Sequence, residues 1–499
     1  MALPQVETLP PNSLSRILIG NKFALAAFLL PLAVRAIPEI IVGPYPIGYD
    51  AITFYVPATI DWAAGRVSLM NMLGTAPLMY MISVPAYLFG ADPVWIFKIL
   101  GPVLYGCMAS ALYRFTRLRL EWSQRKSLAG IAVITVYFIT LRIGWDLYRT
   151  MLGLVFVLLS LSLPHESRGN RETVLRSVLV TLAVLSDQFI GAIALSLTIA
   201  RALLPCAKWN RQAVTRTGEV FGPGAIAFAL ILYTGIALPN VGLVSEHPPL
   251  PSTETITWNI GFLAYAYVLL APLIFIGWRR TPNSDLRNWS IVCLIGAVSV
   301  LFPFLGPNAP SGRWVLLLDL PFCTYSTAGL SVLMTPRGLP QTLIGRIRKL
   351  AIPSLSLFLI ILGSLYILVP AQQAMTYYTL FPTLMPTSMI QNSIPSSDMP
   401  SLRYLLNQAA LDMQDSSVLI THEGIYGWAR EYLPGYSDRV VNYGHASPIL
   451  GVQMARSAGY SKILMIWWVN GSGWYGQRDV PSGFSPLTVD GNMAIYQYN

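Results

Sequence analysis

Apolar stretches long enough to cross a lipid bilayer recur along most of this 499-residue chain. A membrane-spanning helix needs about 20 consecutive apolar residues, and a soluble core does not need many stretches of that length. Only 11% of the residues are charged, whereas a soluble domain usually carries about 25%. The chain is therefore predicted to be a polytopic α-helical membrane protein. We expect about eleven spans, at 20–41, 94–113, 127–143, 149–164, 173–186, 188–204, 220–238, 258–277, 289–305, 314–334 and 350–369.

The net charge of +10 resides in the membrane part of the chain. After Val369 the chain carries six Lys or Arg and eight Asp or Glu residues, a balance of −2. This distribution argues against a nucleic-acid groove, and no nucleic-acid partner is expected. The basic residues alternate with the predicted spans, and the positive-inside rule places their loops, together with the N-terminus, in the cytoplasm. These residues are Arg114, Arg117, Arg119, Arg125, Lys126, Arg168, Arg171, Arg176, Lys208, Arg211, Arg216, Arg279, Arg280, Arg287, Arg337, Arg346, Arg348 and Lys349.

The stretch from Leu69 to Gly90 is apolar enough to be another span, but a crossing there would put the basic loop from Arg114 to Lys126 outside. We therefore expect 69–90 to lie on the outer surface or to re-enter it, with Pro77 and Pro85 interrupting the helix. The alternative is that this stretch spans the membrane and a different pair of runs does not.

Three parts follow from this topology. A transmembrane domain is predicted for 1–369, with a long first outer loop at 42–93. A connector rich in Pro, Ser, Thr and Met occupies 370–400, and a small extracytoplasmic α/β domain occupies 401–499. Within that domain we expect strands at 418–421, 439–443, 463–468 and 493–498, and helices at 401–412 and 449–458.

Asp50 lies in the first outer loop, just before an amphipathic stretch that ends near Gly65. One interpretation is a helix cap, in which the carboxylate accepts the free N–H groups of the following helix. The other is a carboxylate held at the membrane surface, ready to accept a proton. Spacing alone leaves both open.

Two further acidic residues lie at predicted helix junctions. Asp146 occupies a tight outer turn between Arg142 and Arg149, where a local ion pair would also explain the charges. Asp187 separates two short helices, and discontinuous helices of this kind often line a cavity. Asp319, inside a span, is expected to pair with another buried group.

Arg313 opens a predicted span on the outer side, where a basic residue departs from both the positive-inside rule and the preference for anions at a helix start. A cation beside free helix N–H groups is a suitable phosphate site, with snorkelling as the alternative. Glu246 lies in another outer loop, whose composition favours a solvated loop over a functional site. The chain has no P-loop or dinucleotide fingerprint, so no nucleotide cofactor is expected.

Several short motifs together resemble the GT-C superfamily of membrane glycosyltransferases. Asp50 matches the acidic residue of their first outer loop, Asp146 a second outer acid, and Arg313 an arginine that opens a late helix. The run from Ala76-Pro77 through Leu88-Phe89-Gly90 to Lys98 resembles the "KP…YW…FG…R" stretch of the protein mannosyltransferase and lipid A aminoarabinose transferase group. In that group the stretch is a surface helix before the second span.

The sequence also departs from these families. Ala51 stands where a second acidic residue usually follows the first-loop acid. Val244-Ser245-Glu246-His247 resembles the "SVSE" loop of oligosaccharyltransferase catalytic subunits, but Trp467-Trp468-Val469-Asn470-Gly471 lacks the Asp and Tyr of their WWDYG motif.

The resemblance implies an enzyme that moves a sugar from a polyprenyl-phosphate carrier to an acceptor at the outer face, by inverting displacement. Asp50 would be the catalytic base. Substrate would be bound by Asp146, Asp187, Arg313, Glu246 and Lys98. Any divalent cation would use Asp50, Asp146 and Glu246. The alternative function is a transporter or flippase that uses buried charges such as Asp187 and Asp319.

Overall fold

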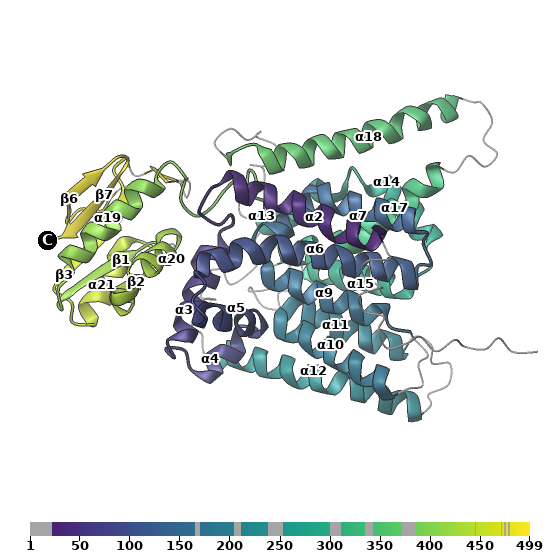
Figure 1. Ribbon diagram of the computed structural model, residues 1–499, viewed down its shortest axis with the longest axis horizontal. Helices are drawn as coiled ribbons and strands as arrows, with labels where there is room; N and C mark the ends of the chain where they lie inside the picture. The colour runs from purple at the N-terminus through teal and green to yellow at the C-terminus, as the bar shows by residue number, and fades with distance from the viewer. Residues whose placement is uncertain are drawn as a thin grey trace, which may run out of the picture.

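The computed structural model describes residues 22–164, 170–203, 211–237, 253–299, 311–334, 343–371, 385–444, 446–470, 472–473, 476–477 and 480–499. Roughly parallel helices form one body, and a small α/β domain is attached at one end of it (Figure 1). Glu246 lies outside the described residues.

The first predicted span is the 20-residue helix α2 (Lys22–Ile41). The long loop after it folds into short helices: a π-helix η1 (Ala51–Tyr55), then α3 (Val56–Ala63), α4 (Leu69–Gly74) and α5 (Leu78–Leu88). Neither α4 nor α5 is long enough to cross a membrane, because eleven residues of helix extend only about 17 Å. Pro77 lies at the start of α5, where its missing N–H costs nothing. The stretch 69–90 is thus divided into two short helices, which supports its prediction as non-crossing.

Each of the other predicted spans contains helix. The helices are α6 (Pro93–Arg119), α7 (Gln124–Val136), α8 (Phe138–Asp146), α9 (Tyr148–Ser162), α10 (Asn170–Ser186), α11 (Gln188–Leu203), α12 (Arg211–Ala237), α13 (Thr253–Tyr267), α14 (Ala271–Arg280), α15 (Ser284–Val298), α16 (Ser311–Leu317), α17 (Asp319–Met334) and α18 (Leu343–Leu368).

Fewer than eleven of these helices are long enough to cross a membrane. Among the described residues, four are long and apolar enough, namely Lys22–Ile41, Pro93–Arg119, Thr215–Thr234 and Gly312–Met334. The number rises to six if each of two bent helix pairs is one span. Helices α9, α10, α11 and α15 have 15 to 17 residues, fewer than the approximately 20 that a bilayer requires. The fold is polytopic and helical, but the predicted count of eleven is not confirmed.

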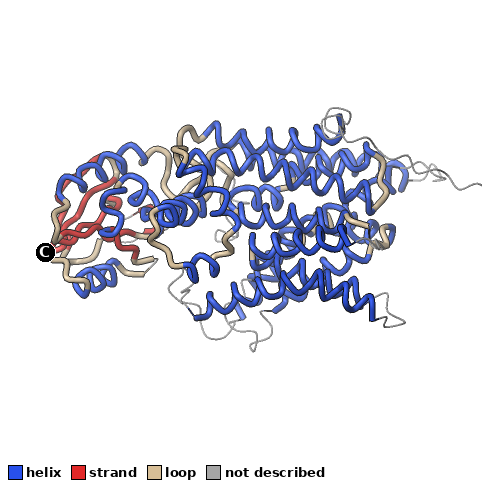
Figure 2. The backbone as a smooth tube through the Cα atoms, turned by 60° about the horizontal axis from the view of Figure 1, so that its bottom comes forward, coloured by secondary structure: helices blue, strands red, loops and turns tan. Residues whose placement is uncertain are grey.

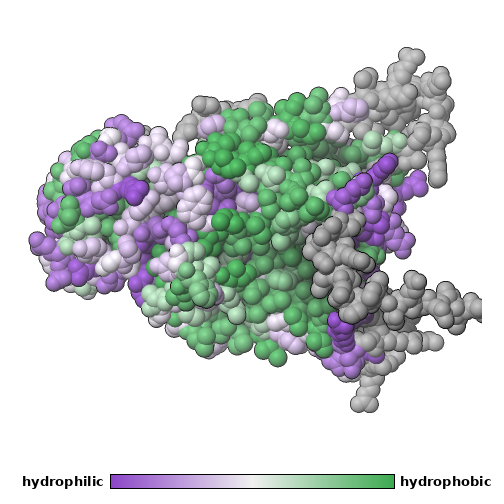
Figure 3. All heavy atoms as spheres, in the orientation of Figure 1, coloured by the Kyte–Doolittle hydropathy of each residue, from purple (hydrophilic) through white to green (hydrophobic). Residues whose placement is uncertain are grey.

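On the face that Figure 3 shows, apolar residues cover the helical body between two more polar ends. Hydrophilic residues gather on the α/β domain at one end and on the helix ends at the other. This band is the expected surface of a protein whose middle faces lipid.

A sharp bend at Tyr137 separates α7 from α8, where the helix axes differ by 67°. The sequence predicted one span at 127–143 here. Eight of the nine α8 residues are buried, so this half-helix runs through protein rather than lipid and ends at Asp146. Broken helices are tolerated at membrane depth where other protein surrounds them.

The strands of the C-terminal domain gather at one end of the molecule (Figure 2). Five of them form one sheet in the order β2-β1-β3-β7-β6. Its strands are β1 (Ser417–Thr421), β2 (Val440–Asn442), β3 (Lys462–Trp468), β6 (Phe484–Asp490) and β7 (Met493–Tyr498), and a separate pair is formed by β4 (Ser472–Gly473) and β5 (Gly476–Gln477). Strand β1 is parallel to β2 and β3, whereas β7 is antiparallel to β3 and β6.

Helices cover this sheet and bury β1 completely, as expected for parallel strands. They are α19 (Met399–Asp412), α20 (Glu423–Tyr432) and α21 (Pro448–Ser457), with a 3₁₀ segment η6 (Pro434–Arg439). The four predicted strands and both predicted helices are confirmed; α20 and β6 had no counterpart among the predictions.

Candidate functional site

Asp50 directly precedes η1, yet its side chain makes no capping hydrogen bond there. The cap interpretation therefore does not describe this residue. Its carboxylate instead faces Arg313 in the first turn of α16, with 3.9 Å between Asp50 Oδ2 and an Arg313 terminal nitrogen. The two side chains are 18% and 34% exposed, so both remain open to solvent or a ligand.

Asp146 holds the backbone beneath Asp50. At the end of α8, its Oδ2 accepts hydrogen bonds from the backbone N–H groups of Tyr49 at 3.2 Å and Asp50 at 3.4 Å. Its Oδ1 accepts from Arg142 at 2.7 Å, so the predicted local ion pair is formed with Arg142. With both oxygens engaged and only 2% of the side chain exposed, Asp146 is a support for Asp50 in this structure.

Gly48 allows this close approach. Its φ of +94° lies in the left-handed region, and a Cβ there would be 2.5 Å from the Asp146 Cβ. Any side chain would therefore be strained and would push Asp146 away. The Gly48 N–H donates to the carbonyl of Gln391 at 2.9 Å, which ties the site to the segment that leads into the C-terminal domain.

A network of buried charged residues links α2, α6 and the start of the outer loop. Glu39, near the end of α2, pairs with Arg35 at 3.0 Å and with Lys98 of α6 at 3.2 Å. Lys98 also donates to the carbonyls of Glu39 at 2.9 Å and Tyr45 at 2.6 Å. These three acceptors use all donors of an ammonium group. Lys98 therefore fixes the start of the outer loop, and its predicted contact with substrate stays a prediction.

Arg35 connects this network to the turn that precedes Asp146. It donates to the carbonyls of Gly144 and Trp145, which directly precede Asp146. Sequence reasoning missed Arg35 and Glu39. The available signal was a pair of opposite charges four residues apart inside an apolar run, because ionised groups at membrane depth need partners.

Arg149 is a third cation whose charge acts on Asp50, after Arg313 and Arg142. Sequence reasoning considered it only as a partner of Asp146, but it donates to the Thr75 carbonyl and its Nε is buried with no hydrogen-bond partner. Its guanidinium lies over the ring of Tyr55, 5.9 Å from the centroid. Tyr55 stacks on Tyr148 at 5.4 Å, so the site has an aromatic wall.

The electrostatics of the site favour a protonatable Asp50. Burial and the neighbouring Asp146 carboxylate raise the pKa of Asp50 from 3.8 to about 7, against the lowering effect of Arg313, Arg142 and Arg149. A carboxyl with a pKa near neutrality can exchange a proton at physiological pH, as general bases do.

Asp187 lies at the junction of α10 and α11, and its charge acts on Arg149 as the charge of Asp50 does. It caps α11, where its Oδ1 accepts from the N–H groups of Phe189 and Ile190, and Thr150 donates to its Oδ2 at 2.8 Å. Asp319 accepts from Thr140 at 2.6 Å and from the Cys323 thiol. Both buried acids thus have local partners. The transporter alternative depended on these two residues.

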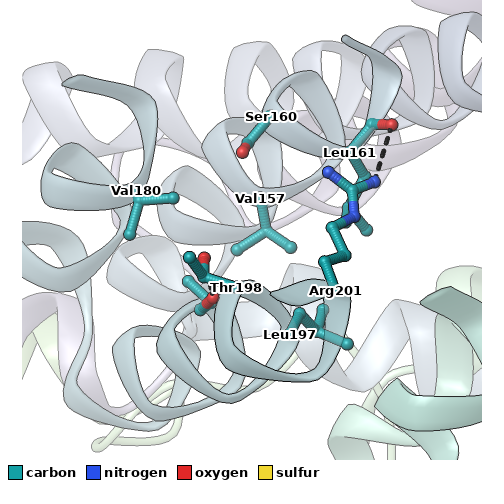
Figure 4. Close-up of a pocket in the computed structure, with 8 residues that line it drawn as sticks. Val157, Ser160, Leu161, Val180, Leu197, Thr198 and Arg201 are labelled. Atoms are coloured by element: carbon teal, nitrogen blue, oxygen red, sulfur yellow. Dashed lines mark hydrogen bonds between the residues drawn. The ribbon is translucent and has the colours of Figure 1, made fainter. Parts of the chain in front are cut away.

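The described residues contain no group of three His, Cys, Asp or Glu side chains placed to hold a metal ion. Asp50 has the more accessible of the two carboxylates at this point, with 18% of its side chain exposed against 2% for Asp146. A narrow pocket between α9, α10 and α11, near Arg201, contains none of the predicted site residues (Figure 4).

Comparison with known proteins finds a likeness in structure but not in sequence. No family model matches the chain, and no curated protein matches its sequence. Its structure is similar to the crystal structure of ArnT from Cupriavidus metallidurans bound to undecaprenyl phosphate, with a TM-score of 0.50 and 11% sequence identity over 98% of each chain. At 11% identity this likeness shows that the chain shares the fold of ArnT, as the resemblance stated from the sequence predicts.

Proposed function

We propose that the protein transfers a sugar from a polyprenyl-phosphate carrier to an acceptor, at the membrane face that carries the C-terminal domain. The observation behind this proposal is the Asp50 carboxylate, which caps no helix and faces Arg313 at 3.9 Å at the end of a lipid-embedded body. The ArnT-like fold supports a lipid-linked donor.

Asp50 is the catalytic base in this proposal. Its Oδ2 takes the proton of an acceptor hydroxyl as the hydroxyl oxygen attacks C1 of the sugar. The bond between C1 and the phosphate oxygen breaks, and its electron pair leaves with the polyprenyl phosphate. Direct displacement inverts the configuration at C1, by analogy with inverting glycosidases.

Arg313 binds the donor phosphate and stabilises the charge that grows on it. A guanidinium is suited to this role because its planar N–H groups match two phosphate oxygens. Asp146, Asp187, Glu246 and Lys98 remain proposed substrate-binding residues. If a divalent cation takes part, Asp50, Asp146 and Glu246 are its proposed ligands.

The orientation belongs to the same proposal. The basic loops and the N-terminus are cytoplasmic, so Asp50, Arg313 and the C-terminal domain are extracytoplasmic. The membrane accounts for the lipid carrier, because the long polyprenyl chain stays in the bilayer while its phosphate reaches the surface.

The test uses purified protein in liposomes with undecaprenyl-phosphate-linked labelled sugars, offered singly with candidate hydroxyl acceptors. We expect release of undecaprenyl phosphate together with a labelled acceptor, both lost in Asp50→Asn. Labelled substrate that accumulates inside the liposomes without any new glycosidic bond would contradict the transferase and favour the transporter.

A further inference from the structure

The turn that follows Asp50 is an unusual piece of helix. Residues 51–55 form a π-helix, in which the Val56 N–H donates to the Ala51 carbonyl five residues earlier. In the same pattern, the N–H of residue 57 would donate to the Ile52 carbonyl, but Pro57 has no N–H. A wide turn that interrupts helical bonding is often found at functional sites. Its geometry needs support from outside the turn.

Helix α20 of the C-terminal domain supplies that support at the Ile52 carbonyl. A Cβ on Gly427 would be 1.6 Å from the Ile52 oxygen, 2.5 Å from the Ile52 carbonyl carbon and 3.2 Å from the Thr53 nitrogen. Glycine inside a helix is unfavourable. Here it lets the backbones of α20 and η1 touch, with a Gly427 Cα hydrogen directed at the Ile52 oxygen.

Flanking contacts fix α20 in this position. Arg430, one turn after Gly427, is hydrogen-bonded to Asp61 in α3, directly beyond the π-turn. Trp428 is fully buried, and its indole N–H donates to Ser393 at 2.9 Å. Its ring also contacts Tyr45 edge-on, with 5.5 Å between centroids. Helix α20 thus contacts the chain both before Asp50, at Tyr45, and after it, at Asp61.

From this geometry we infer that α20 is a positioning element, and Gly427 a positioning residue, for the Asp50 carboxylate. This inference rests on the proposed function and gives the C-terminal domain a role in it. Asp146 holds the Asp50 segment from below through two backbone N–H groups, and α20 holds it from the opposite domain through the Ile52 carbonyl. An open or displaced C-terminal domain would release the π-turn and misplace the base.

Gly427→Ala tests the inference, because its methyl group would meet backbone atoms that cannot rotate away. Gly435→Ala is the matched control, since a Cβ on Gly435 meets nothing within 4 Å in the same domain. Hydrogen–deuterium exchange of the full-length protein reports on residues 49–60 without any substrate. We expect at least tenfold faster exchange there in Gly427→Ala and no change in Gly435→Ala.

Transfer kinetics supply the second readout. Gly427→Ala should lower kcat at least tenfold while KM for the lipid-linked donor stays within threefold, because Arg313 is untouched. If Gly427→Ala does not fold, Arg430→Gln replaces it, with Arg430→Lys expected to restore part of kcat. Unchanged exchange at 49–60 together with an unchanged kcat in these variants would overturn the inference. If the wild-type protein has no transferase activity but exchange at 49–60 is still faster in Gly427→Ala, the proposed function is wrong. The structural role of the α20 contact is then retained.

Discussion

Two Arg–Asp pairs lie near opposite ends of helix α9 and differ in every respect that matters for function. Arg201 binds Asp285 through two hydrogen bonds of 2.6 and 2.7 Å, with side chains 9% and 2% exposed. Arg313 approaches Asp50 through one contact of 3.9 Å, with side chains 34% and 18% exposed. Helix α9 separates them by roughly 20 Å, since it runs for 15 residues from next to Asp146 to the Leu161 carbonyl, which Arg201 also contacts.

The comparison separates charges that hold the fold from charges that are available to a substrate. A bidentate buried pair satisfies both partners and leaves nothing for a ligand. A loose, half-buried pair keeps its donors and acceptors ready while neighbouring groups fix its position. Variants of the two pairs should therefore affect different properties of the protein.

The largest effect is expected for Asp50→Asn on activity. Loss of a general base should reduce kcat about 10²- to 10⁴-fold. Stability should not fall. Because the pKa of Asp50 is raised from 3.8 to about 7, the folded state binds its proton more tightly than the unfolded state, and ionisation costs stability as pH rises from about 4 to 7. Asp50→Asn should thus have a Tm at pH 8 no lower than that of the wild type, measured by thermal unfolding in detergent.

Arg201→Ala should act in the opposite way. Removing one partner of a buried pair leaves the Asp285 charge uncompensated and typically costs about 3–5 kcal/mol. We expect a clearly lower Tm, with kcat per folded molecule within a few-fold of the wild type. An unchanged Tm would show that this pair does not hold the fold.

Arg313→Ala should impair transfer with little change in stability. The loss of a preorganised cation at the leaving group is expected to lower kcat/KM about 10²-fold, whereas a loose, half-buried ion pair at 3.9 Å should contribute only about 1 kcal/mol to folding. Arg313→Lys should recover only part of the rate, because lysine cannot form the same planar contact with phosphate. Equal kcat/KM in the alanine variant and the wild type would remove Arg313 from the mechanism.

Much of the fold followed from the sequence, because hydrophobic run length and loop charge are local properties. Every predicted span contains helix, and 69–90 is divided into two short helices. The bend at Tyr137 was not predicted, since it depends on the protein that surrounds α8 rather than on local composition. Helix α20 was missed because Gly424 and Gly427 weaken its helical pattern, and Gly427 is explained only by its contact with Ile52.

The candidate site shows the same division. Asp50, Asp146 and Arg313 were selected as charged residues at outer helix ends, and the structure brings Asp50 to both Arg313 and the Asp146 turn. The partners of Asp146 and Arg149 could not be assigned, since both arginines are near Asp146 in sequence. In the folded turn, Arg142 forms the ion pair with Asp146, and Arg149 donates to the Thr75 carbonyl.

The pH dependence of transfer tests the role of Asp50 as a base most directly. With a pKa of about 7 for this carboxyl, the wild-type kcat/KM should rise tenfold per pH unit below 7 and level off above it, because only the ionised carboxylate accepts a proton. Arg313 lowers this pKa, so the midpoint should move to higher pH in the residual activity of Arg313→Ala. A profile that is flat from pH 5 to 9, or one that falls as pH rises through 7, would contradict the assignment of Asp50 as the catalytic base.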